Sequence, residues 1–167
     1  MTPAGTEIAV RMGEIAVSAN AGDMLVSLGL GSCIGLAVVD QRRGIAGLAH
    51  IMLPEAIPGG GPVGKFADVA VPELIARTTA LGTTKTALEA VIVGGAQMFS
   101  LGSSGAMDIG VRNDVAVRAL LAQDRIPVVA AETGGSKGRT IRVVPGGIVL
   151  SKEAGGAEKE LIAGISR

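Results

Sequence analysis

Two apolar segments on either side of a short polar stretch constrain this chain most. Residues 34–40 and 45–52 consist almost entirely of aliphatic side chains, and the four residues between them are Gln41, Arg42, Arg43 and Gly44. Apolar runs of this length that flank a few turn-forming residues are typical of the two strands of a β-hairpin. The sequence therefore predicts an antiparallel pair of apolar strands at this point of the chain.

The remaining segments carry both strand and helix patterns. Further strands are predicted at residues 14–18, 24–28, 90–93, 126–131, 140–144 and 148–150. Helical spacing predicts one helix over residues 65–81, in which Pro72 implies a kink or an early break, and a second from a cap at Asp108 to about residue 123. We expect an α+β layered domain, with helices on a sheet, and a single domain of residues 1–167 in which about 1–7 and 152–167 are flexible tails.

Three local expectations accompany this fold. The second helix is predicted to bury a face formed by Val111, Val115, Leu120 and Leu121. Residues 100–105 have the composition of a mobile loop. The polar end of the chain is expected to contain a short helix at residues 158–165.

The chain has a single cysteine, Cys33, and a single histidine, His50, and both lie beside the predicted hairpin. If Gln41 and Arg42 form a two-residue turn, Cys33 and His50 are directly opposed, with Cβ atoms about 4.5–5.5 Å apart. A three-residue turn would shift the register by one and send the two side chains to opposite faces. Contact between thiol and imidazole therefore depends on the length of the turn.

A paired imidazole can take the thiol proton and leave a thiolate, the form of cysteine that attacks carbonyl carbon. The glycines at positions 29, 31 and 35 favour a tight turn whose backbone N–H groups could hold an oxyanion near the sulfur. The residues alone leave other readings open: Cys33 as a small core side chain, His50 as a structural residue, and the glycines as a phosphate loop, although no following helix or lysine supports the last.

Composition excludes several other functions. Basic and acidic residues balance at 15 each and the basic ones are scattered, while only Phe66 and Phe99 are aromatic, so a nucleic acid is an unfavourable partner. One cysteine and one histidine are too few for the usual zinc ligand sets. No stretch approaches the roughly 20 apolar residues of a membrane span, and no secretory signal is recognised, so we expect a cytoplasmic protein.

Several ordered blocks resemble the CheD family of chemoreceptor glutamine deamidases. They are LGLGSCIGLAVVD at residues 28–40, GLAHIMLP at 47–54, VGGAQMF at 93–99, IGVRN at 109–113 and TGGSKGRT at 133–140. The resemblance implies an α/β layered sandwich similar to bacterial toxin deamidases, with Cys33, His50 and Ser27 as the catalytic group. At Ser27 the family typically has threonine, so this chain keeps the hydroxyl and lacks the methyl group.

The resemblance also implies a function. It is deamidation of glutamine side chains on the cytoplasmic region of methyl-accepting chemotaxis receptors, through a cysteine thioester and without a metal or organic cofactor. Hydrolysis of glutamyl methyl esters and binding of the phosphatase CheC are compatible with the same resemblance. The alternatives are a binding module for CheC or receptors with no catalysis of its own, and a thiol amidase for small molecules.

Overall fold

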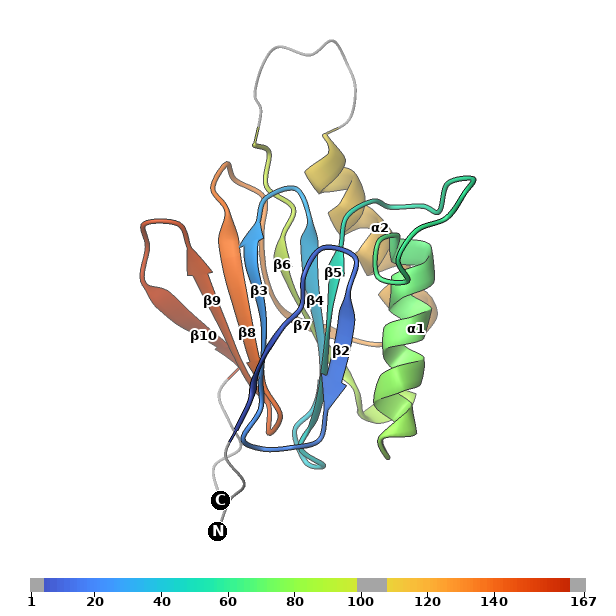
Figure 1. Ribbon diagram of the computed structural model, residues 1–167, viewed down its shortest axis with the longest axis vertical. Coiled ribbons are helices and arrows are strands. Elements are labelled where there is room, and N and C mark those ends of the chain that lie inside the picture. Colours follow the sequence, from blue (N-terminus) through green and yellow to red (C-terminus); the bar gives the residue numbers. More distant parts are fainter. Residues whose placement is uncertain (1–4, 99–107, 163–167) are drawn as a thin grey trace.

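The computed structural model describes residues 5–98 and 108–162, which form two five-stranded sheets and two α-helices (Figure 1). Sheet A has the order β1 (Glu7–Ala9), β3 (Met24–Leu30), β8 (Arg139–Val144), β9 (Ile148–Glu153), β10 (Glu158–Ile162). Sheet B has the order β2 (Ile15–Ser18), β5 (Ile45–Ile51), β4 (Ile34–Asp40), β6 (Glu89–Gly94), β7 (Val128–Thr133). The helices are α1 (Ala67–Ala80) and α2 (Ile109–Gln123), with a short 3-10 turn at Lys85–Ala87.

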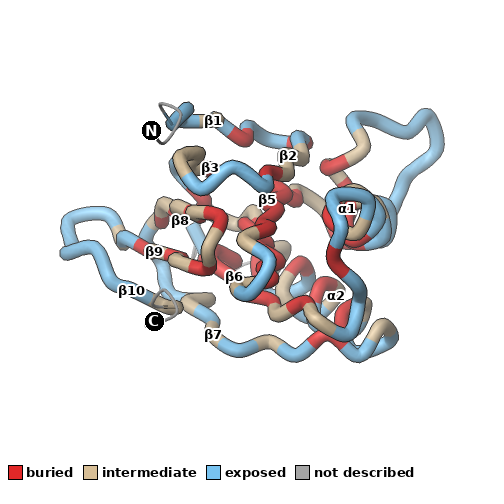
Figure 2. Tube along the Cα trace, turned by 90° about the horizontal axis from the view of Figure 1, so that it is seen from below, coloured by how far each residue is buried: buried red, intermediate tan, exposed pale blue. Residues whose placement is uncertain are grey.

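The elements pack as three layers, with sheet B in the middle. One face of sheet B packs on sheet A through an aliphatic cluster that includes Val39, Leu48 and Ile141. The other face is covered by α1 and α2, through a second cluster that includes Leu36, Leu74 and Leu121. Burial is greatest in strands β4, β5 and β6 of sheet B, while β7 at the edge of that sheet and β1 and β10 at the edges of sheet A are largely intermediate or exposed (Figure 2). The mixed α+β fold expected from the sequence is confirmed.

Strands β4 and β5 form the predicted hairpin, but its register differs from the prediction. Ile34 pairs with Ile51, Gly35 with His50, and Asp40 with Ile45, so the turn contains four residues. The expected direct pairing of Cys33 with His50 is therefore wrong, because His50 lies opposite Gly35. The register of the strand pairing is shifted by two residues from the prediction. Such a shift keeps every side chain on the face it was predicted to occupy, because side chains alternate between the two faces with a period of two.

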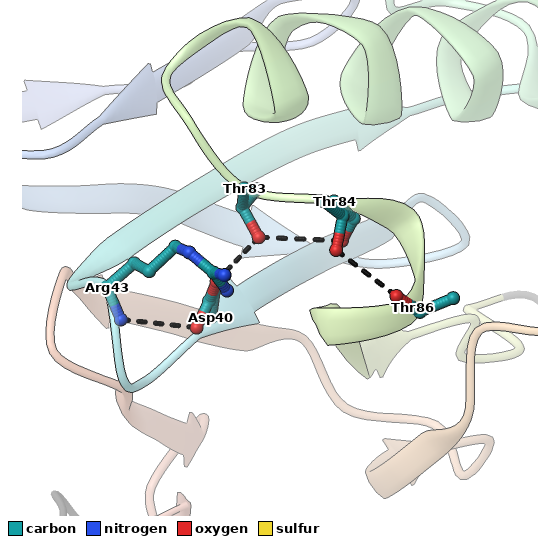
Figure 3. A network of polar contacts seen from close by, with 5 residues as sticks. All are labelled: Asp40, Arg43, Thr83, Thr84 and Thr86. Carbon is teal, nitrogen blue, oxygen red and sulfur yellow. Dashed lines mark hydrogen bonds and ion pairs between the residues drawn. The ribbon is translucent and has the colours of Figure 1, made fainter.

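The side chain of Asp40 explains why the turn has four residues. Its carboxylate accepts a hydrogen bond from the backbone N–H of Arg43 at 3.2 Å and another from the Arg43 guanidinium at 2.9 Å (Figure 3). Gly44 follows with φ +66, a conformation that glycine adopts without strain. The hydroxyl of Thr83, from the segment after α1, donates to the same carboxylate at 2.5 Å. The N–H of Gly44 also donates to the carbonyl of Gln41 at 3.3 Å, so a backbone hydrogen bond and the side chain of Asp40 together close the four-residue turn.

Both predicted helices form, with two corrections. Helix α1 continues through Pro72, so no early break occurs. Asp108 caps α2 as predicted, accepting a hydrogen bond from the N–H of Gly110 at 3.2 Å. The buried face of α2 matches the prediction only at its end, where Leu121 is buried and Leu120 packs against the core. Val111 and Val115, which were also predicted to be buried, are 45% and 58% exposed, and the other buried positions are Gly110, Asn113 and Val117.

The edges of sheet A contain strands that the sequence pattern did not indicate. β10 pairs with β9 where a short helix in a polar tail was expected, and β1 pairs in parallel with β3. The charged side chains of β10 find partners on neighbouring strands, since Lys159 lies 3.1 Å from Glu132 and Arg142 lies 3.0 Å from Glu158. The predicted mobile loop at residues 100–105 lies outside the described residues. Within the described part of the chain, neither helix has the length and apolar character needed to span a bilayer.

Candidate functional site

Cys33 lies one residue before β4, in a loop whose backbone is held on one side. Three successive carbonyl groups of this loop accept hydrogen bonds: Gly31 from the N–H of Ala96, Ser32 from the side chain of Asn113, and Cys33 from the N–H of Gly95. The thiol itself is half-buried and packs against the cluster between the two sheets. The loop is therefore fixed in place while the sulfur stays partly open.

His50 lies near the end of β5 and points into the same inter-sheet space. Its side chain is 3% exposed, and Nδ1 lies 3.1 Å from the backbone carbonyl oxygen of Val10. A carbonyl oxygen can only accept, so Nδ1 carries the hydrogen and donates it. Nε2 is buried and has no hydrogen-bond partner among the described residues. In a neutral ring of this tautomer, Nε2 holds a lone pair that can accept a proton.

Ser27, on β3 of sheet A, meets the same carbonyl group. Its hydroxyl is completely buried and donates to the Val10 oxygen at 2.7 Å. Ser27 and His50 thus share one acceptor, a carbonyl oxygen with two lone pairs. Ser27 is connected to the imidazole through the carbonyl of Val10 and not by a hydrogen bond of its own. The N–H of Val10 donates to the carbonyl of Val26 at 2.7 Å, which fixes this acceptor against β3.

Cys33 and His50 share a face of sheet B but are not hydrogen-bonded to each other. The residue that pairs with His50 is Gly35, two positions after Cys33, so the thiol and the imidazole stand in a diagonal relation across β4 and β5. Diagonal neighbours on antiparallel strands are about 7–8 Å apart at their backbones, within reach of long side chains. A Cβ on Gly35 would press on Leu30 and Ile141 of sheet A, so only glycine leaves room at this position.

Burial acts on both titratable groups and favours their neutral forms. It raises the pKa of the Cys33 thiol, and the backbone N–H of Cys33, which stabilises the thiolate, offsets only part of this effect. Burial also lowers the pKa of His50, against smaller opposing contributions from the Val10 carbonyl and the Glu14 carboxylate. Burial therefore acts against an ion pair of thiolate and imidazolium and favours a thiol beside a neutral imidazole.

A surface cleft of about 360 Å³ reaches His50 from the side of sheet A. It is lined by His50 together with residues of β1, β3 and the β1–β2 connection, namely Glu7, Ala9, Val10, Arg11, Met12, Val26, Leu28. Two of these, Met12 and Leu28, are unusually exposed for apolar side chains, at 61% and 64%. The cleft thus offers apolar surface beside the imidazole.

Two buried polar residues near Cys33 were not singled out from the sequence. Asn113 is completely buried on α2, and Arg139 on β8 is 8% exposed, with its guanidinium donating to the carbonyl of Gly134 at 2.8 Å. A signal for Asn113 was present, since it falls with Gly110 and Val117 on one helical stripe, where a polar residue is unusual. Arg139 gave no such signal within its strand.

The fold and the site define a class of protein: a two-sheet α+β domain that turns one thiol and one imidazole toward the same inter-sheet space. A family model described as "CheD chemotactic sensory transduction" matches residues 52–153. The chain belongs to the CheD family.

Individual relatives agree with this assignment. The "Probable chemoreceptor glutamine deamidase CheD" of Clostridium kluyveri is 48% identical over 121 residues, which cover 70% of this chain and 74% of the relative. The protein of the same name from Symbiobacterium thermophilum is 41% identical over 158 residues, covering 92% of this chain and 96% of the relative. The one from Clostridium botulinum (strain Alaska E43 / Type E3) is 42% identical over 139 residues, covering 81% and 85%.

Proposed function

We propose that this protein deamidates glutamine side chains of chemoreceptors, with Cys33 as nucleophile and His50 as general base. One observation carries the proposal: the single thiol and the single imidazole of the chain face the same space, and Nε2 of His50 has no partner among the described residues. The relatives' names, chemoreceptor glutamine deamidase, supply the substrate class. The apolar cleft beside His50 would receive the receptor segment that carries the glutamine.

The first half of the reaction forms a thioester. Nε2 of His50 takes the proton of the Cys33 thiol as the sulfur attacks the carboxamide carbon, which gives a tetrahedral intermediate with a negative oxygen. Backbone N–H groups, including that of Cys33, stabilise this oxygen. His50 then returns the proton to the amide nitrogen, the C–N bond breaks, and ammonia leaves. Because burial favours the neutral form of both groups, this scheme transfers the proton as the sulfur attacks.

The second half releases glutamate. His50 deprotonates a water molecule that attacks the thioester carbon, the C–S bond breaks, and Cys33 leaves with the proton held on Nε2. One amide and one water become a carboxylate and an ammonium ion, so no redox partner is required. A glutamyl methyl ester would form the same thioester with methanol as the leaving group. No step calls for a metal or an organic cofactor.

Ser27 acts in this scheme as a positioning residue. Its hydroxyl holds the Val10 carbonyl, and that carbonyl holds Nδ1–H of His50, so the ring is kept in the tautomer that leaves Nε2 free to accept a proton. The arrangement explains how a serine can serve where a threonine is typical, because only the hydroxyl makes the contact.

The proposed substrate is the cytoplasmic region of a methyl-accepting receptor, which places the protein in the cytoplasm, and the phosphatase CheC is a candidate regulatory partner. The test is to incubate the purified protein with a receptor cytoplasmic fragment and follow, by mass spectrometry, the replacement of –NH₂ by –OH at individual glutamines. Cys33→Ala is expected to abolish the change and to unfold cooperatively, since the thiol lies at a loop-to-strand junction.

Other outcomes would point to the alternatives. Receptor binding without deamidation by the wild-type protein would identify a binding module. Release of ammonia from free glutamine as readily as from the receptor fragment would identify an amidase for small molecules. Loss of folding in Cys33→Ala would assign the thiol to the core.

A further inference from the structure

The buried side chain of Asn113 connects α2 to both halves of the proposed site. Its Nδ2 group donates to the carbonyl oxygen of Ser32 at 3.0 Å and to the carbonyl oxygen of Met52 at 2.9 Å. Ser32 immediately precedes Cys33, and Met52 is two residues after His50. Both partners are acceptors, so the amide must turn its nitrogen toward them, and this orientation is fixed by the chemistry of the contacts.

These two hydrogen bonds lie just beyond the end of the strand ladder. The pairing of β4 with β5 ends at Ile34 and Ile51, so Ser32 and Met52 are outside it. Asn113 joins the two chain segments from a third element and continues the connection past the last strand pair. The loop of residues 31–33, which carries the proposed nucleophile, is the nucleophile loop. Its placement relative to the end of β5 is therefore set in part by a helix side chain.

The contact with Ser32 also fixes the direction of a proposed oxyanion donor. The carbonyl of Ser32 and the N–H of Cys33 belong to one planar trans peptide, in which the two groups point in opposite directions. A carbonyl held toward α2 thus turns the N–H of Cys33 away from the helix. The N–H of Cys33 also acts to lower the pKa of the Cys33 thiol, against the larger effect of burial.

We propose that Asn113 is a positioning residue for the deamidation reaction, which orients the Ser32–Cys33 peptide so that its N–H faces the sulfur and the developing oxyanion. The inference rests on the proposed function and deepens it. It also explains why α2 carries a polar residue on a stripe otherwise formed by Gly110, Val117 and Leu121, even though the Oδ1 atom of Asn113 is buried with no hydrogen-bond partner among the described residues, which is costly.

The experiment compares Asn113→Ala and Asn113→Asp with the control Val117→Ala, which removes buried side-chain volume from the next turn of the same stripe. Asn113→Asp keeps the size of the side chain and cannot donate when ionised, so it avoids the cavity that alanine leaves. Because loss of a single oxyanion donor costs about 10²–10³ in kcat, we expect misorientation to lower kcat on a receptor fragment by at least roughly tenfold. KM should change little in both variants, and Val117→Ala should keep the wild-type kcat.

A second measurement needs no substrate. The pH dependence of Cys33 alkylation by iodoacetamide should move to higher pH in Asn113→Ala, because the N–H that stabilises the thiolate is no longer held toward the sulfur, and it should stay unchanged in Val117→Ala. An unchanged alkylation profile in Asn113→Ala, or a wild-type kcat in folded Asn113→Asp, would overturn the inference. If the wild-type protein failed to deamidate receptors while the alkylation profile shifted as expected, the proposed function would fail and the positioning of the Cys33 peptide would stand.

Discussion

Gly94, at the end of β6, offers a direct test of how closely the nucleophile loop is fitted. Its φ is +117, and a Cβ at this position would overlap the carbonyl oxygen of Cys33. The same carbonyl accepts a hydrogen bond from the N–H of Gly95 at 2.9 Å. In Gly94→Ala the Cys33 carbonyl must move, and that hydrogen bond must lengthen or break.

Gly82 provides a matched control, because it has the same φ of +117 and no atom within 4 Å of an added Cβ. Both alanine variants carry the backbone strain of this conformation, about 1–3 kcal/mol. Only Gly94→Ala also leaves the Cys33 carbonyl without its partner, which adds about 1–3 kcal/mol. Displacement of a reacting group by about 1 Å typically costs on the order of 10²-fold in rate.

The measurements are urea unfolding of both variants and the initial rate of deamidation of a receptor fragment. We expect Gly82→Ala to lose only the strain energy and to keep the wild-type rate, and Gly94→Ala to lose more stability and most of its activity. Equal losses of stability in the two variants, together with an active Gly94→Ala enzyme, would refute the idea that Gly94 holds the nucleophile loop in place.

Three further predictions follow from the site and the turn. Ser27→Ala should lower kcat less than His50→Ala, because removal of a general base typically lowers the rate by about 10²–10⁴-fold. Equal kcat values for the two variants would contradict the positioning role of Ser27. Since burial raises the pKa of Cys33, the midpoint of its alkylation by iodoacetamide should lie above about pH 8.5, and a thiol that reacts rapidly near pH 6 would contradict this direction. Since the pKa of His50 is lowered, kcat/KM should fall on the acid side only below about pH 6.5, and a fall that begins above this pH would contradict that direction. Burial acts to raise the pKa of Asp40, but hydrogen bonds from Thr83 and Arg43 outweigh it and the pKa is lowered. Its contribution to stability should therefore be present above about pH 3.9 and be lost as the pH falls through the lowered pKa, so wild type should show a steeper acid loss than Asp40→Asn in unfolding experiments.

Local patterns predicted the elements better than their pairing. The strands at residues 34–40 and 140–144 and the Asp108 cap of α2 follow from apolar runs and from a capping side chain. The register of the hairpin depends instead on Asp40, whose carboxylate is also held by Thr83 from a distant segment. No rule based on turn composition includes that contact. The predicted strand register was therefore wrong by two residues, although each side chain was assigned to the correct face of the sheet.

The buried side of α2 shows a second limit of periodicity. Val111 and Val115 fit an apolar stripe as well as the residues that are in fact buried, yet they face outward. Gly110 determines which face of α2 is buried, because an added Cβ at this position would come within 2.6 Å of the Ala96 carbonyl oxygen. Only a glycine face lets the helix approach the segment after β6 so closely, and this approach brings Asn113 to the nucleophile loop.

For the proposed site residues, the sequence indicated which side chains to consider but not how they are connected in the structure. Cys33 and His50 stand out as the only thiol and the only imidazole, and the resemblance to a known family indicated Ser27. The link between Ser27 and His50 is a backbone carbonyl, that of Val10. Every residue has such a group, so no residue type in the sequence could mark it.

The shared carbonyl of Val10 has a consequence for the order in which the molecule assembles. Ser27 belongs to sheet A and His50 to sheet B, while Val10 lies on the segment that passes from β1 in one sheet to β2 in the other. Neither sheet alone contains the Ser27–Val10–His50 connection. The imidazole can be held in this tautomer only after the two sheets have docked. Under the proposed mechanism, a chain that has formed its hairpins but not its inter-sheet core is therefore unable to act on a glutamine.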